Sequence, residues 1–147
     1  MEKEEFIRIK EWPTEYAQGA YNQGNYIEAI QVLHGFIETK LQELLILEGS
    51  KSNDMEEIWD IANQISLTNC VKVLFIIGEI TKREYQDIIF FNKIRNQIVH
   101  GLFHDTYEHG VRGVSRKKFD IAFDKGMDLC DNLQRKGEMK IEKKNTL

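Results

Sequence analysis

Apolar residues recur at intervals of three and four positions along most of this chain, whereas stretches that alternate between apolar and polar residues are scarce. A period near 3.6 places apolar side chains on one face of a helix, while a period of two would indicate strands. The sequence contains a single proline, Pro13, so proline interrupts the helical pattern nowhere else. The sequence therefore predicts an all-α fold with five or six helices. The clearest amphipathic run contains Ile30, Leu33, Ile37, Leu41, Leu44 and Leu45.

Helix-start and helix-stop residues set the expected bounds of these helices. Thr81 with Glu84 forms a capping box, and Ser115 is expected to cap the last helix, which Gly137 is expected to end. Thr68 is expected to cap a helix that is apolar on nearly all sides, so we expect that helix to be deeply buried. A loop over residues 104–114 precedes the last helix. The expected helices cover residues 13–23, 25–48, 54–65, 69–77, 81–102 and 115–136.

The length and composition fit one globular domain. With 147 residues the chain can bury a core of its own, and we expect a single domain over 1–147, with its core at about 13–136 and a flexible charged tail at 138–147. Hydrophobic residues make up 41% and charged residues 30%, which is typical of soluble proteins. The longest apolar run, Val73–Ile77, is too short to cross a membrane, and the first residues lack the apolar stretch of a secretory signal. The sequence thus predicts a cytoplasmic protein without membrane contact.

Charge and cysteine content narrow the expected partners. The net charge of −4 disfavours a broad polyanion-binding face, so any contact with nucleic acid must be local. Cys70 and Cys130 are far apart and neither belongs to a Cys-x-x-Cys pair, which gives no support to a zinc or dithiol redox site. Both cysteines are expected to be reduced core residues. Trp12 and Trp59 are also expected in the core rather than as base-stacking platforms.

The candidate site lies late in the expected helix 81–102. On a helical wheel Arg95 falls within a wide apolar arc, and Asn96 and His100, four positions apart, lie at the edge of that arc. A guanidinium cannot lose its charge, so it needs either an acid from another helix or a cleft where an anion binds. The first alternative is a buried salt bridge to Glu28, Glu38 or Glu43. The second makes Arg95, Asn96 and His100 a candidate catalytic group.

These residue types suit the cleavage of a phosphodiester without a metal. Histidine is a common acid–base residue near neutral pH, which makes His100 a candidate to remove or donate a proton, and the Arg95 guanidinium can bind phosphate oxygens. The Asn96 carboxamide can orient the phosphate or the imidazole. Because one histidine supplies only one acid–base group, a two-fold dimer would be needed to supply both a base and an acid.

Several further residues near this motif are candidates for RNA binding, with ordinary solvated charges as the alternative. A basic helix start is unfavourable for the helix dipole, which favours an anion there. His104 lies four positions beyond His100, as in a zinc half-site, but no glutamate lies between them and Gly101 weakens the helix. We therefore expect no metal and no cofactor. The candidate RNA-binding residues are Lys93, His104, Arg112 and Arg116.

The segment Arg95–His100 resembles the R-N-x-x-x-H signature of HEPN domains (higher eukaryotes and prokaryotes nucleotide-binding). Residues 24–30 resemble the opening helices of that family, and the resemblance covers about residues 16–133. It implies an up-and-down bundle that dimerises through the motif-bearing helix. It also implies a metal-independent endoribonuclease, a toxin or defence effector that cleaves RNA to a 2′,3′-cyclic phosphate. Arg95 and His100 would be its catalytic pair and Asn96 the adjacent polar residue.

The resemblance further implies a possible antitoxin of nucleotidyltransferase type. In one toxin branch the motif continues His-x-Tyr and the antitoxin nucleotidylates the tyrosine, whereas this chain has Leu102 at that position. That route of neutralisation is in doubt here. Two other functions stay open: a noncatalytic HEPN-fold module that binds nucleotides, RNA or a protein, and a helical module of tetratricopeptide type. A second copy of residues 24–30 about 34 positions away is absent from the sequence, which counts against a repeat array.

Overall fold

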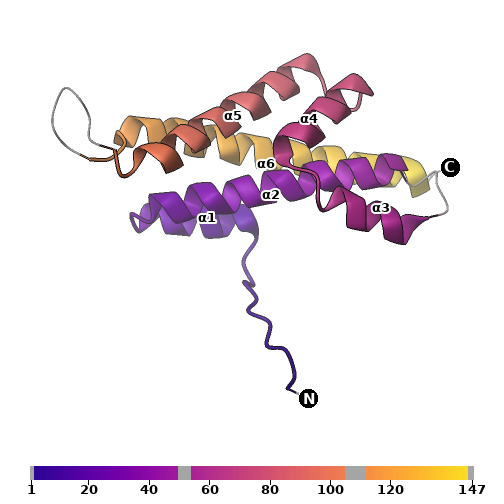
Figure 1. The fold of residues 1–147 in the computed structure, drawn as a ribbon, viewed down its shortest axis with the longest axis horizontal. Coiled ribbons are helices and arrows are strands. Elements are labelled where there is room, and N and C mark those ends of the chain that lie inside the picture. Colours follow the sequence, from indigo (N-terminus) through magenta and orange to yellow (C-terminus); the bar gives the residue numbers. More distant parts are fainter. Residues whose placement is uncertain (1, 50–53, 105–111, 146–147) are drawn as a thin grey trace.

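The computed structural model describes residues 2–49, 54–104 and 112–145. Within these ranges the chain forms six helices and no strand, which confirms the all-α prediction (Figure 1). The loop predicted over 104–114 falls mostly on residues 105–111, outside the described part. The helices are α1 (Pro13–Asn22), α2 (Tyr26–Gly49), α3 (Met55–Ala62), α4 (Leu67–Ile76), α5 (Lys82–Gly101) and α6 (Arg116–Asn145).

Four of the helices run up and down along one axis. Figure 1 shows α1 and α5 running in one direction and α2 and α6 in the other. Helix α2 packs against α1 and α6 and forms the centre of the bundle, while α5 packs on α6. The short helices α3 and α4 connect α2 to α5, and α4 packs against both of those helices. Helix α5 also contacts α2, and its remaining face is exposed.

The core follows the helical pattern of the sequence. Leu33, Ile37 and Leu41 of α2 are fully buried, as are Ile88, Phe91 and Ile98 of α5. Helices α2, α5 and α6 pack tightly at Gly126, where a Cβ atom would lie 2.8 Å from Phe91 Cε2 and 3.0 Å from Leu33 Cδ1. Only a residue without a side chain fits there without displacing its neighbours.

Both cysteines lie in this core. Cys70 and Cys130 are buried, which confirms their predicted structural role. Burial raises the pKa of the Cys70 thiol to about 11 and that of Cys130 to about 12, so both stay protonated at neutral pH. In the described ranges no helix combines the length and apolar character that a membrane span requires.

The helix starts agree largely with the sequence. The Thr81 N–H donates to the Glu84 carboxylate at 2.8 Å, and the Glu84 N–H donates to Thr81 Oγ1 at 3.1 Å, which confirms the predicted capping box. Ser115 Oγ accepts from the Lys118 N–H at 3.3 Å, as predicted. The predicted cap of α4 is wrong, because Ser66, not Thr68, precedes the helix and its Oγ accepts from the Asn69 N–H. Thr68 lies in the first turn instead.

The predicted end of the last helix is also wrong. Helix α6 continues through Gly137 to Asn145, so residues 138–145 of the expected flexible tail are helical. The Lys140 ammonium lies 2.8 Å from a Glu48 carboxylate oxygen and also pairs with Glu79, and the Lys144 ammonium donates to the Leu47 carbonyl. These contacts fix the last turns of α6 against the end of α2 and the α4–α5 connection.

Two expectations of burial fail. Helix α4 buries Leu67, Cys70, Val71 and Leu74, but its other face is exposed, with Ile76 81% accessible. Helix α4 contacts the bundle with one face only, so it is not buried on all sides even though its residues are apolar on nearly all sides. Trp12 and Trp59 are 45% and 47% exposed, so neither is a core residue.

Candidate functional site

The second half of α5 carries a small pocket with a largely apolar surface, to which several polar side chains contribute. Asn96 is half-buried, while Lys93 and His100 are exposed. These three positions are spaced by three and four, so their side chains share one face of the helix. Thr68 at the start of α4 closes one side of the pocket, which has a volume of about 450 Å³. Its lining is Thr68, Ile89, Asn92, Lys93, Asn96, Gln97 and His100.

The Arg95 side chain points away from this pocket, but it is hydrogen-bonded to Asn96, which lines the pocket. Five positions separate Arg95 from His100, which places them about 140° apart around the helix axis. The Arg95 Nε–H donates to Gln31 Oε1 on α2 at 2.9 Å, and an Nη1–H donates to Asn96 Oδ1 at 3.0 Å. The arginine therefore lies in the seam between α2 and α5, and Asn96 connects its guanidinium to the pocket that His100 lines.

The predicted salt-bridge alternative for Arg95 is wrong. In the described ranges no carboxylate lies within ion-pair distance of its guanidinium. Glu28 accepts from the Tyr16 hydroxyl, Glu38 accepts from the Leu67 N–H at 3.1 Å, and Glu43 pairs with Lys40 at 2.9 Å. Among the described residues, the Arg95 guanidinium donates hydrogen bonds to neutral groups but pairs with no carboxylate.

Sequence reasoning missed a second histidine beside this site. His34 of α2 lies with its Nε2 atom 3.2 Å from Asn92 Oδ1, and the Asn92 amide donates to Thr68 Oγ1 at 3.4 Å. Burial and the nearby Arg95 guanidinium lower the pKa of His34, against the opposing effects of Asn92 and Glu38. A signal for it existed, since His34 is a polar residue four positions after Ile30 and three before Ile37 in the apolar stripe of α2.

Three of the four predicted RNA-binding residues, His104, Arg112 and Arg116, do not line the pocket of Asn96 and His100. His104 and Arg112 are exposed and lie in the connection between α5 and α6. The Gly113 N–H donates to the His104 carbonyl at 3.3 Å, which places residues 104 and 113 close together. Of the four candidates, Lys93 alone lines the same pocket as His100.

Arg116 is engaged within its own chain. Its guanidinium donates to Asp120 at 2.9 Å and to the Tyr26 hydroxyl at 2.6 Å, and it stacks 4.3 Å from the centroid of the Tyr26 ring. Hydrogen bonds to Asp120 and Tyr21 raise the pKa of Arg116 above its ordinary value. An anion that binds Arg116 must compete with the Asp120 carboxylate.

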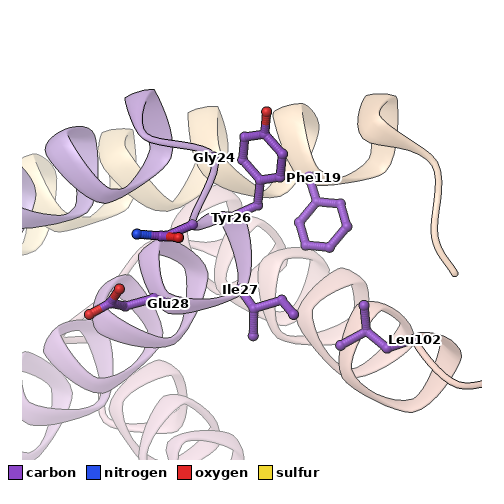
Figure 2. A pocket seen from close by; sticks show the side chains of 7 residues that line it. Gly24, Tyr26, Ile27, Glu28, Leu102 and Phe119 are labelled. Carbon is purple, nitrogen blue, oxygen red and sulfur yellow. The ribbon is translucent and has the colours of Figure 1, made fainter.

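A second pocket lies beside Arg116, where the α1–α2 turn meets the end of α5 and the start of α6. Figure 2 shows Ile27 of α2 and Leu102 facing one another across it, with Phe119 and Tyr26 above them. Its volume is about 620 Å³, and Gly24, Asn25 and Glu28 complete its lining. This pocket is largely apolar, and the described residues that line it include no histidine.

Metal ligands do not gather in the part of the chain that the structure describes. Across residues 2–49, 54–104 and 112–145, no three His, Cys, Asp or Glu side chains are placed to hold one ion. The His100–His104 spacing, which is like that of a zinc half-site, gains no third ligand from these residues.

No protein-family model matches the chain, and comparison with the curated proteins and with the solved structures found no match. The HEPN resemblance therefore rests on the motif Arg95–His100, residues 24–30 and the helical order of the sequence.

Proposed function

We propose that this chain is a metal-independent endoribonuclease of HEPN type, a toxin or defence effector that cleaves RNA as a homodimer. The observation that carries the proposal is the arrangement around Asn96. This residue lines the same pocket as His100 and accepts a hydrogen bond from the Arg95 guanidinium, which pairs with no carboxylate among the described residues. Asn96 thus connects a cation in the α2–α5 seam to the pocket that the proposed acid–base group lines.

The proposed reaction uses these groups in fixed roles. The His100 imidazole removes the proton from a ribose 2′-hydroxyl, and the 2′-oxygen attacks the adjacent phosphorus. Lys93 stabilises the negative charge that gathers on the phosphoryl oxygens, and Arg95 acts through its hydrogen bond to Asn96, which orients the phosphate. The bond from phosphorus to the 5′-oxygen breaks, and a second acid protonates that oxygen. The products are a 2′,3′-cyclic phosphate and a 5′-hydroxyl end.

A second copy of the chain is proposed to supply the acid. His34, the other histidine near the pocket, does not line it, and its Nε2 atom is bonded to Asn92. The outer stripe of α5 is exposed, so a two-fold related copy can approach there and bring its own His100 to the pocket. This stripe consists of Gln86, Phe90, Lys93, Gln97 and His100.

The proposal includes a possible nucleotidyltransferase-type antitoxin as partner. Leu102 occupies the position of the tyrosine that such an enzyme modifies in one toxin branch, so neutralisation here would use another residue. A noncatalytic HEPN-fold module is the competing function, and the net charge of −4 favours it.

Incubation of the purified chain with total RNA in EDTA tests the proposed activity. The wild-type chain is expected to produce fragments and His100→Ala is expected to produce none. Thr39→Ala is the control, because Thr39 is an exposed residue of α2 that does not line the pocket. Identical fragment patterns from the wild type and His100→Ala would reject the proposal, and RNA binding without cleavage would favour the noncatalytic module.

A further inference from the structure

A chain of hydrogen bonds leads from α2 through α5 to α4 and ends at the wall of the pocket. It begins at His34, passes through the Asn92 carboxamide and ends at the Thr68 hydroxyl. Asn92 and Thr68 line the pocket, whereas His34 lies behind them. We propose that His34 is a positioning residue. It holds the Asn92 carboxamide in one orientation, in which Asn92 and Thr68 present hydrogen-bond donors to an anionic phosphoryl oxygen in this pocket.

The direction of these hydrogen bonds follows from the atoms involved. Asn92 Oδ1 can only accept, so His34 Nε2 must carry the proton that joins them at 3.2 Å. The Asn92 amide nitrogen then donates to Thr68 Oγ1 at 3.4 Å. Because Thr68 Oγ1 accepts this hydrogen bond, its own hydroxyl proton is available as a donor. The second proton of the Asn92 amide is available as well.

The N–H donor of His34 matters because the oxygen and the NH₂ group of a carboxamide have nearly the same shape. Without a fixed donor on the α2 side, Asn92 could turn by 180° and present its oxygen to the pocket instead. A carbonyl oxygen would repel an anionic phosphoryl oxygen, whereas N–H and O–H groups bind it. His34 therefore selects the orientation that suits an anion.

The surroundings of His34 agree with a positioning role. The imidazole is half-buried and stacks on Phe91 of α5, with ring centroids 6.4 Å apart. The charged groups that affect it are Arg95 of α5 and Glu38 of its own helix, and α4 contributes the uncharged Thr68. Burial and Arg95 lower its pKa, so the ring is neutral at pH 7 and keeps one N–H as donor.

The inference rests on the proposed function for the identity of the anion, and single-turnover cleavage of a labelled RNA in EDTA tests it. His34→Leu removes the donor, and we expect the cleavage rate to fall about tenfold to a hundredfold, as for other groups that orient a functional side chain. His34→Gln keeps an N–H donor at similar reach and should restore most of the rate with the wild-type pH profile. In an Asn92→Ala background, His34→Leu should have no further effect, because His34 acts through Asn92. Circular dichroism of each variant checks the fold.

Three results would overturn the inference while the nuclease proposal stands. They are a wild-type rate for His34→Leu, a loss of equal size in the Asn92→Ala background, and a lost limb of the pH profile in His34→Gln. If the wild type does not cleave RNA, the nuclease proposal fails and inorganic phosphate serves as the probe. A phosphate-dependent NMR shift of the Asn92 side-chain amide in the wild type, absent from His34→Leu, would then support the inference. No shift in the wild type would overturn it.

Discussion

Arg95 holds a positive charge at the α2–α5 seam with neutral partners only, Gln31 and Asn96, among the described residues. The guanidinium is half-buried, so water still solvates part of it. A guanidinium with only neutral partners contributes little to the free energy of folding, because its hydrogen bonds in the folded chain differ little in free energy from those that it makes with water in the unfolded chain. Under the proposed function this charge acts on a bound anion through Asn96, so a substitution should affect activity far more than stability.

We predict that Arg95→Ala lowers the free energy of unfolding by only about 1 kcal/mol, because water can replace the two hydrogen bonds that the substitution removes. The same substitution should abolish RNA cleavage. Urea unfolding measures the first effect, with Arg83→Ala, an exposed arginine at the start of α5, as the matched control. A loss of about 3 kcal/mol or more would indicate a buried ion pair instead.

Which residue meets Arg95 could not be predicted from the sequence, although its place on the helix could. The motif spacing gives the angles of Arg95, Asn96 and His100 around α5, because those angles depend on helix geometry alone. The contacts to Gln31 and of His34 to Asn92 depend on the rotation of α2 relative to α5. That rotation is set by packing across the whole interface, which no local pattern encodes.

Helix α6 is held at its end by contacts with residues far away in sequence. Gly137 lies within the helix, and its φ is negative, unlike Gly24, Gly78 and Gly113. The start of α5 was predictable because Thr81 and Glu84 act within one turn. The end of α6 was not, because Lys140 reaches Glu48 and Glu79 only after the bundle has formed.

We predict that Gly137→Ala stabilises the protein by about 0.5–1 kcal/mol, because alanine favours a helix interior over glycine. An added Cβ atom at this position would meet nothing within 4 Å. Thermal unfolding measures the effect. A destabilised variant would mean that Gly137 ends the helix in a left-handed conformation, which alanine rarely adopts.

Glu84 connects the start of α5 to α6 and makes stability depend on pH. Burial acts to raise its pKa, but hydrogen bonds from the Thr81 N–H, Asn132 and Lys136 outweigh burial and hold the pKa below its ordinary value. The stabilisation is fully present above the pKa of the unfolded chain, about 4.3. It is lost as the pH falls through the lower pKa of the folded state.

Glu84→Gln should therefore flatten the fall in unfolding free energy between about pH 5 and pH 3. Urea unfolding at several pH values measures this slope. Glu56→Gln, at an exposed position of α3, is the control and should leave the slope as in the wild type. An unchanged slope in Glu84→Gln would show that other carboxylates carry the acid sensitivity.

The molecule as a whole depends on the close packing of α2, α5 and α6 around Gly126. We predict that Gly126→Ala destabilises the protein by about 1–3 kcal/mol, because the added methyl group displaces Phe91 and Leu33. Gly35→Ala is the matched control in an exposed helical position, where a Cβ atom meets nothing within 4 Å, and it should stabilise slightly. Equal effects of the two substitutions on thermal unfolding would contradict this packing.

The pocket that Asn96 and His100 line borders the exposed stripe of α5, where we propose that a second copy approaches. Single-turnover cleavage of a labelled RNA in EDTA, by the wild type and by His100→Ala, tests this proposed site most directly. The wild type should yield a 2′,3′-cyclic phosphate, and His100→Ala should be slower by about 10²- to 10⁴-fold, the range for loss of an acid–base group. Equal rates for the two proteins, or no cleavage by the wild type, would contradict the proposed nuclease.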